Sequence, residues 1–119
     1  MNITQFIEKT LKTFRQKLDE RYRTSIIDCT TEGTTSSFAI SPNIFYKWGT
    51  ITTSLTLTLN TPADLTITNE YMFQFTTGST APTLFLPNTI TWMGGAPVIS
   101  ANKTYQVSIV NDLAVIGEF

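Results

Sequence analysis

The chain contains no histidine and only one cysteine among its 119 residues. Without histidine, no Ser-His-Asp or Cys-His catalytic arrangement can form, and the commonest general base and metal ligand is missing. A single cysteine, Cys29, excludes an internal disulfide, so we expect it to pack as a small hydrophobic side chain. The sequence also lacks GxGxxG, a phosphate-binding Gly-Lys-Ser/Thr loop and CxxC. These absences predict a protein without enzymatic activity and without a cofactor or metal.

Charged residues are scarce, at 14% of the chain against about 25% in typical soluble domains. Threonine, at 23 residues, is correspondingly abundant. Because threonine is β-branched, polar and neutral, it suits the solvent-facing side of a β-sheet. The net charge of −1 predicts no nucleic-acid partner. This composition is typical of extracellular or particle-borne β-proteins.

Long apolar runs are absent too, and no segment approaches the roughly 20 apolar residues of a membrane span. The N-terminus has no basic region followed by an apolar run, so it does not read as a secretory signal. We therefore expect a protein that is made in a cytoplasm and is not inserted in a membrane. If it acts outside the cell, a route such as lysis takes it there.

A helix is predicted over residues 3–23, with Asn2 as its N-cap and Gln5 reaching back to it. Its apolar residues recur at spacings of four and three, on one stripe: Ile3, Ile7, Leu11, Phe14, Leu18 and Tyr22. Residues 1–24 hold six basic and three acidic side chains, whereas residues 25–119 hold two and six. A basic amphipathic helix therefore precedes a weakly acidic region.

Three interpretations of this helix remain open. It packs on its own β-domain, it meets copies of itself or docks on a larger assembly, or it lies on a membrane surface. The second interpretation assigns oligomerisation or docking to Ile7, Leu11, Phe14 and Leu18. We expect residues 1–24 to form this assembly helix, residues 25–36 a connector with a short strand at Ile26 and Ile27, and residues 37–119 one β-domain.

Period-two alternation dominates after the connector. It is clearest over residues 49–60, where Ile51, Leu55, Leu57 and Leu59 face one way and threonine and serine the other. Shorter segments with this pattern are 37–40, 44–48, 65–68, 71–75, 83–87, 90–92, 97–100, 104–110 and 113–119. The expected fold class is mainly β: an antiparallel, jelly-roll-like β-sandwich preceded by one amphipathic α-helix.

Large aromatic residues near turns are the best candidates for ligand binding, because exposed rings stack on sugars and anchor interfaces. These are Tyr46, Trp48 and Trp92; the alternative is that the two tryptophans fill the ends of the core. Gly94 and Gly95 are expected to supply the positive φ of a tight corner. The carboxylates of the β-region are expected to be solvated surface groups rather than a glycosidase pair.

The last 50 residues carry a specific arrangement: FQFTTGSTAPTLFLP (73–87), ITW with GGAP (90–97) and ANKTYQVSIVNDLAVIGEF (101–119). This order resembles a C-terminal β-module of bacteriophage tail-fibre, baseplate and head-fibre proteins. The resemblance implies a β-sandwich, usually trimeric, on a virion, without enzymatic activity.

With the helix, the resemblance predicts a short trimeric appendage of a virion that contacts other virion proteins and host-surface glycans. A capsid decoration or head-fibre protein with a mainly structural role is the alternative, and a glycan-processing enzyme is a third.

Overall fold

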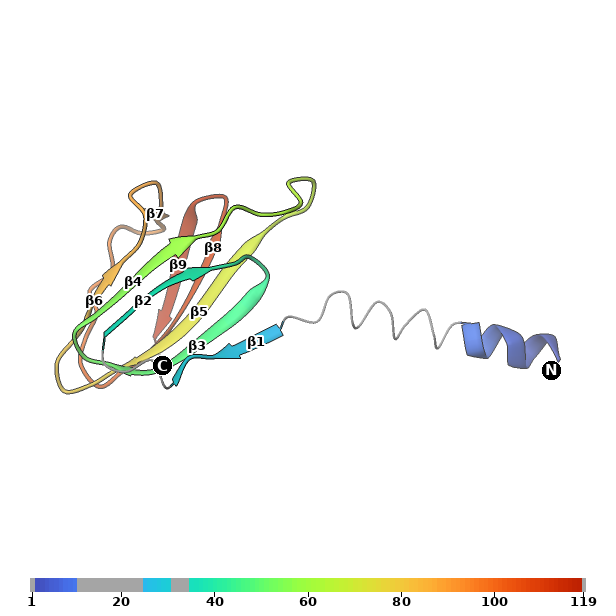
Figure 1. Ribbon diagram of the computed structural model, residues 1–119, viewed down its shortest axis with the longest axis horizontal. Coiled ribbons are helices and arrows are strands. Elements are labelled where there is room, and N and C mark those ends of the chain that lie inside the picture. The colour runs from blue at the N-terminus through green and yellow to red at the C-terminus, as the bar shows by residue number, and fades with distance from the viewer. Residues whose placement is uncertain (1, 11–24, 31–34, 119) are drawn as a thin grey trace.

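Figure 1 shows the computed structural model of the protein, which describes residues 2–10, 25–30 and 35–118. Nine strands lie within these residues, in two sheets. The larger sheet has six strands: β1 (Ser25–Asp28), β3 (Ile44–Ile51), β5 (Glu70–Thr77), β7 (Thr91–Trp92), β8 (Thr104–Val110) and β9 (Leu113–Glu118). The smaller sheet has three: β2 (Thr35–Ile40), β4 (Ser54–Leu59) and β6 (Thr83–Phe85).

Up to β7 the chain crosses from one sheet to the other after each strand. The sheet orders are β1-β3-β5-β8-β9-β7 and β2-β4-β6. Pairing is parallel for β1–β3, β3–β5, β2–β4, β4–β6 and β7–β9, and antiparallel for β5–β8 and β8–β9. A mainly β fold is confirmed, but the expected antiparallel pairing was wrong for most described pairs, and no jelly-roll order is present in them. Each strand in the opposite sheet serves as the crossover that a parallel neighbour requires.

The first two parallel strand pairs, one in each sheet, have the same spacing along the chain. Ser25 pairs with Ile44 and Thr35 with Ser54, so both sheets advance by 19 residues. The next partners are further apart, 29 residues between Ser54 and Thr83. The additional residues include the loop 60–69, which projects from one end of the sheets in Figure 1.

The expected boundary at residue 37 was wrong, because the connector contributes to both sheets. β1 lies inside it, as expected for Ile26 and Ile27, and β2 begins at Thr35. Residues 65–68 and 97–100 were also wrongly expected to be strands. Leu65, Ile67 and Val98 are 77%, 51% and 85% exposed, so the alternation there buries nothing.

A β-bulge in β3 changes which residues face the core. The pairing with β5 shifts between Lys47 and Thr50, so that one extra residue is accommodated. Tyr46 faces inward before the shift, Trp48 within it and Ile51 after it; all three are at most 3% exposed. On β4, Leu55 and Leu57 are buried as expected, and Leu59 is half-buried. On β5 and β8 the alternation buries Phe73, Phe75, Tyr105, Val107 and Ile109, and it leaves Tyr71 half-buried.

Trp48 lies at the centre of a continuous series of aromatic contacts. Its ring centroid is 5.9 Å from that of Phe38 on β2, and 6.5 Å from that of Phe73 on β5. Its indole N–H donates to the Ser36 hydroxyl at 3.1 Å, inside the core. The side chain of Trp48 therefore links the two sheets by packing and by a hydrogen bond. Cys29 is 3% exposed in the same cluster, as expected.

A six-residue turn occurs twice, as SPNIFY (41–46) and SANKTY (100–105). In each copy the serine N–H donates to the tyrosine hydroxyl, at 2.9 Å for Ser41 and 2.8 Å for Ser100. In each, the asparagine has a positive φ, 64° for Asn43 and 58° for Asn102. Its N–H donates to a carbonyl at one end of β5, that of Glu70 or that of Gly78. The two turns thus flank β5 at its opposite ends.

The N-terminal helix is confirmed over residues 3–10, and its expected remainder lies outside the described residues. The capping arrangement is as expected: the Gln5 N–H donates to Asn2 Oδ1 at 2.8 Å, and the Asn2 N–H to Gln5 Oε1 at 3.2 Å. Every side chain from residue 2 to residue 10 is exposed. Figure 1 shows this segment apart from both sheets.

Ser36→Ala should destabilise the protein by about 1–3 kcal/mol, because it leaves the buried indole N–H of Trp48 without an acceptor. Ser37→Ala is the matched control: Ser37 is exposed, so its loss should change stability by about 0.5 kcal/mol or less. Urea unfolding followed by circular dichroism measures both variants. Equal unfolding midpoints would contradict a structural role for this hydrogen bond.

The repeated turn gives a second prediction. Asn102→Gly should leave stability nearly unchanged, whereas Asn102→Ala should cost about 1–2 kcal/mol through the positive φ. Asn43→Gly should be destabilising despite its permissive backbone. The Asn43 side chain donates to Asn69 at 3.0 Å and accepts from the Glu70 N–H at 3.1 Å. Thermal unfolding compares the three variants, and a neutral Asn43→Gly would contradict this role of the Asn43 side chain.

Candidate binding surfaces

Two of the three aromatic candidates do not reach the surface. Tyr46 and Trp48 are 3% and 1% exposed, so neither ring offers a face to a ligand, and their assignment as ligand-binding residues was wrong. The bulge and the packing against Phe38 turn both rings inward, and the alternative of a core-filling tryptophan describes Trp48 correctly. The Tyr46 hydroxyl is occupied by the Ser41 N–H.

Trp92 remains accessible in part. It pairs with buried Ala114 and is half-buried against the core, beside the Gly94–Gly95 corner, whose φ values of 81° and 91° are positive as expected. Its side chain borders a hollow of about 380 Å³. This Trp92 groove lies between β6 and the segment after β7 and is lined by Ala81, Pro82, Thr83, Leu84, Trp92, Ala96, Pro97 and Ile99. It offers ring and proline surfaces to an apolar or stacking ligand.

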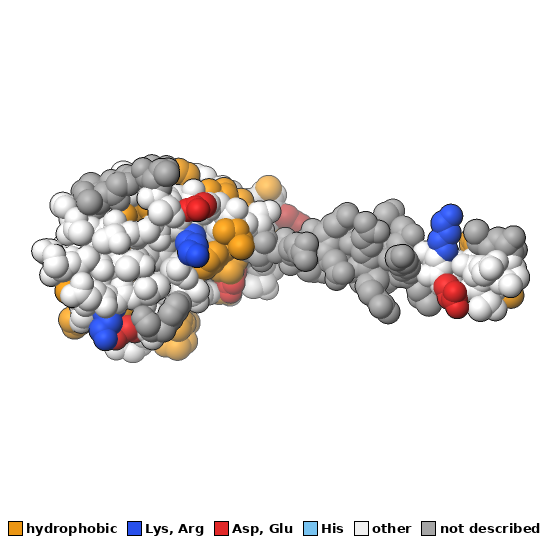
Figure 2. Space-filling model, turned by 90° about the horizontal axis from the view of Figure 1, so that it is seen from below, with side chains coloured by type: hydrophobic (Ala, Val, Ile, Leu, Met, Phe, Trp, Pro, Cys, Tyr) orange, Lys and Arg blue, Asp and Glu red, His pale blue; other side chains and the backbone are white. Residues whose placement is uncertain are grey.

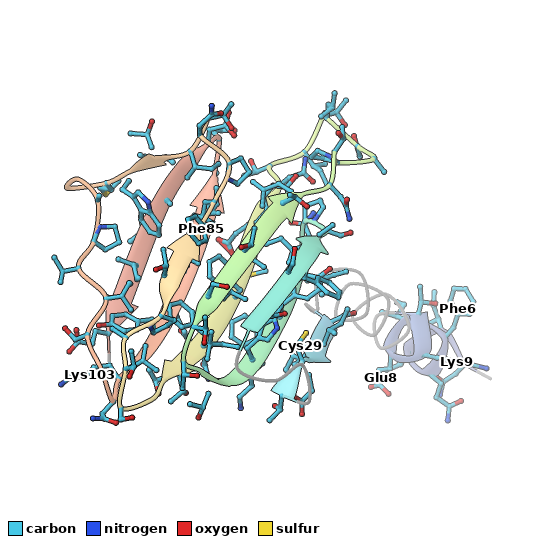
Figure 3. The ribbon with its side chains drawn as sticks, turned by 60° about the vertical axis from the view of Figure 1, so that its left-hand side comes forward. Phe6, Glu8, Lys9, Cys29, Phe85 and Lys103 are labelled. Atoms are coloured by element: carbon cyan, nitrogen blue, oxygen red, sulfur yellow. The ribbon has the colours of Figure 1, made fainter. Side chains whose placement is uncertain are left out.

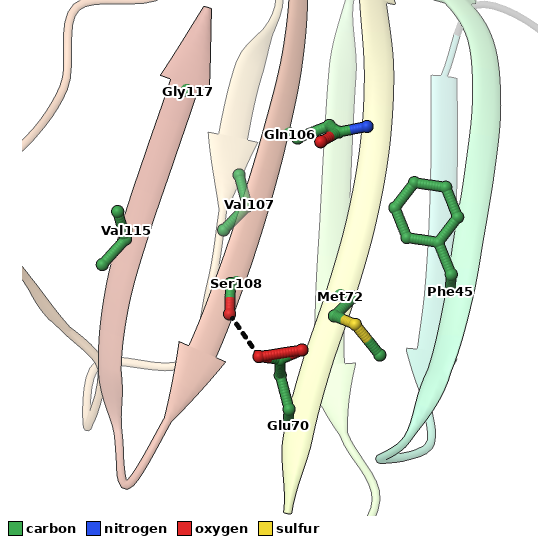
Figure 4. Close-up of a pocket in the computed structure, with 8 residues that line it drawn as sticks. All are labelled: Phe45, Glu70, Met72, Gln106, Val107, Ser108, Val115 and Gly117. Atoms are coloured by element: carbon green, nitrogen blue, oxygen red, sulfur yellow. Dashed lines mark hydrogen bonds between the residues drawn. The ribbon is translucent and has the colours of Figure 1, made fainter. Parts of the chain in front are cut away.

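The outward side of the six-stranded sheet carries a second, shallow hollow of about 440 Å³. Figure 4 shows its residues on four neighbouring strands: Phe45, Glu70, Met72, Gln106, Val107, Ser108, Val115 and Gly117. A Cβ added at Gly117 would meet no atom within 4 Å, so this strand leaves open space at the surface. The hollow is shallow, open and partly apolar, and it is not a deep ligand pocket.

The polar groups of this outward face have partners within it. The Ser108 hydroxyl donates to Glu70 Oε2 at 3.0 Å, and Gln106 Nε2 donates to Gln74 Oε1 at 2.8 Å. At the sheet edge, hydrogen bonds from the Thr30 hydroxyl and the Thr30 N–H lower the pKa of Asp28, with a further contribution from Lys47. The charged groups among these are Glu70, which has a hydroxyl beside it, and Asp28, which lies in register with Lys47.

The helix residues assigned to assembly are described in part. Ile7 is 49% exposed, and Ile3 and Phe6 are 76% and 60% exposed, while Leu11, Phe14 and Leu18 lie outside the described residues. Figure 3 shows Phe6 with Glu8 and Lys9 on this segment, apart from the sheets. Within residues 3–10, the interpretation that the helix packs on its own β-domain is therefore wrong.

No group of three or more cysteine, aspartate and glutamate side chains suited to a metal occurs in the described part of the chain. Its carboxylates make local contacts: Asp64 accepts from Thr66, and Glu118 from Tyr105 at 3.3 Å while facing Lys103 at 3.4 Å. The described residues include no helix with the length and apolarity that a membrane crossing requires. Figure 2 shows a surface dominated by neutral polar groups, with a few charges between apolar patches.

The apolar residues of the outward face were missed in the sequence, although a signal was present. Phe45, Met72 and Val115 each follow a residue that faces the core, so the strands are apolar in both phases of the alternation. In a sheet with one solvated face, the second phase is usually polar. Two apolar phases indicate a strand that is covered, or can be covered, on both sides.

Comparisons with protein-family models, with curated proteins and with solved structures found no match to this chain.

Proposed function

We propose that this protein is a non-enzymatic structural protein of a bacteriophage virion, a short trimeric appendage of the fibre or baseplate kind that contributes to host-surface adhesion. The resemblance of residues 70–119 to virion β-modules motivates the proposal. The exposed apolar helix supports it best. Ile3, Phe6 and Ile7 are 76%, 60% and 49% exposed on an element apart from the sheets. Such a helix needs a partner to cover it, either the same helix of other copies or another virion protein.

The β-domain suits a projecting role. Its two sheets enclose one core, so we describe it as a β-sandwich. The outward sides of β2 and β4 carry neutral hydroxyl groups, among them Ser37 beside Thr56. Neutral hydroxyls and a half-buried tryptophan are chemistry that a glycan accepts, through hydrogen bonds and ring stacking. Host-surface glycan is therefore the proposed ligand, and the Trp92 groove is its proposed site.

A capsid decoration or head-fibre protein is the second candidate. The burial of Tyr46 and Trp48 favours it, because it leaves Trp92 as the remaining ring of the three candidates for ligand stacking. In that case the Trp92 groove is a packing feature, and the protein contributes to particle stability rather than to adhesion.

Sedimentation velocity of the purified full chain tests the assembly. We expect a trimer whose fraction falls on dilution, because about two and a half heptads of apolar stripe form only a weak isolated coiled coil. A monomer at every concentration would refute the trimeric appendage. The decoration role without self-assembly would then remain.

Binding of the fluorescently labelled protein to host cells tests the adhesion. Trp92→Ala should weaken cell binding by about tenfold or more if the Trp92 groove holds a glycan ring. Ile67→Ala is the matched control, because Ile67 is 51% exposed in the loop 60–69, which does not line the groove. Circular dichroism confirms that both variants are folded. Equal cell binding by the two variants would favour the decoration role.

A further inference from the structure

The outward face of the six-stranded sheet carries an apolar row that crosses five strands. The strand registers place its members side by side: Ile26, Phe45, Met72, Ser108 and Val115. Ile26 and Val115 are 69% and 47% exposed, and Phe45 and Met72 are half-buried. Four of the five members are apolar, so the row is a continuous hydrophobic strip rather than scattered surface residues.

The rows on either side contain mostly neutral groups. On one side, Asp28 pairs in register with Lys47, and Gln74 with Gln106, so opposite charges are adjacent. On the other side, Glu70 pairs in register with Val110, and its carboxylate is held by Ser108. Glu70 has a hydroxyl rather than a cation beside it, so copies can meet at low cost where this carboxylate stays at the solvated rim of the contact.

The size of the face is compatible with a protein contact. Five strands spaced by about 4.8 Å, each about seven residues long at about 3.3 Å per residue, cover roughly 550 Å². In a trimer each copy would bury at most about 550 Å² of this face, less than the roughly 800 Å² per partner of a standard interface. This area is sufficient for a contact that works together with a second one, such as the helices.

We propose that this outward face of the six-stranded sheet is an interface between copies of this chain, with the apolar rows of the three copies facing one another around the threefold axis of the proposed trimer. The inference deepens the proposed function, because it names a surface that holds the assembly together. It takes from the proposed function only the number of copies, which is three. The apolar row has few charged residues beside it and can cover the same row of another copy, which favours further copies of this chain as its occupant. A lipid surface would require several basic residues around the apolar row. Among the described residues of these rows the basic residue is Lys47, which lies in register with Asp28, so the row does not suit a lipid surface.

Val115→Lys tests the interface in the full chain. It places an ammonium group at one end of the apolar row, inside the contact, so the concentration at which the assembly dissociates should rise about a hundredfold. Val98→Lys is the matched control with the same chemical change. Val98 is 85% exposed outside the strands, so its variant should dissociate within about twofold of the wild type. Sedimentation velocity over a dilution series gives the three dissociation concentrations.

Thiol labelling gives a readout that does not depend on disrupting the assembly. The native Cys29 is 3% exposed, so a cysteine introduced by Val115→Cys or by Val98→Cys is the accessible thiol of the described residues. The thiol at position 115 should react with a maleimide at least about tenfold more slowly than that at position 98 in the assembly. The difference should disappear on dilution to monomer.

The remaining outcomes would overturn the proposal in distinguishable ways. If the two lysine variants dissociate equally and the two thiols are labelled equally, the proposed interface is wrong. The trimer then uses another surface, and the proposed function stands. Protection of the thiol at position 115 in a monomer would identify the N-terminal segment of the same chain as the occupant. A wild-type protein that is monomeric throughout would refute both this interface and the trimer, while the cell-binding assay would still test adhesion.

Discussion

The burial of Trp48 is the constraint on which the two-layer structure depends. Its ring touches Phe38 of the three-stranded sheet and Phe73 of the neighbouring strand, while its N–H bonds to the Ser36 hydroxyl. An indole can be buried completely only where its N–H finds an acceptor. The register shift next to Trp48 then lets β3 bury Ile51 three residues later. One side chain thus sets the sheet separation and the phase of β3.

This inward use of aromatic residues decides what remains at the surface. The rings continue from Trp48 through Phe73 and Phe75 to Tyr105, with centroids 5.5–6.5 Å apart, and fill the layer between the sheets. No further large side chain is needed inside, so Phe45 and Met72 face outward in the alternate phase. A strand that is apolar in both phases is stable in water only if its second face is small or covered. The surface available for recognition is therefore an apolar strip and a half-buried Trp92.

The sequence predicted which residues face the core better than it predicted which strands are neighbours. Alternation identified Leu55, Phe73 and Val107 because side chains follow a period of two whatever the pairing. It could not distinguish parallel from antiparallel pairing, since both bury the same phase, and the alternation of strands between sheets leaves no local signature. The Asn2 cap and the Gly94–Gly95 corner were predictable because they are local. Tyr46 and Trp48 were misassigned because closeness to a turn does not determine which face a ring occupies.

The N-terminal helix and the outward sheet face both favour a protein that works in an assembly. A chain with 14% charged residues has little electrostatic repulsion to keep its copies apart. Ile7 on the helix and Val115 on the sheet are 49% and 47% exposed, and they lie on elements that do not cover one another. Two separate apolar surfaces on so small a chain are a liability for a free monomer, because each invites non-specific association. In an assembly the same surfaces become contacts, and neither alone has to supply the whole binding free energy. This division fits a predicted helix stripe that is too short for a stable coiled coil and a sheet face that is small for an interface. Both features fit the proposed role as one subunit of a larger assembly.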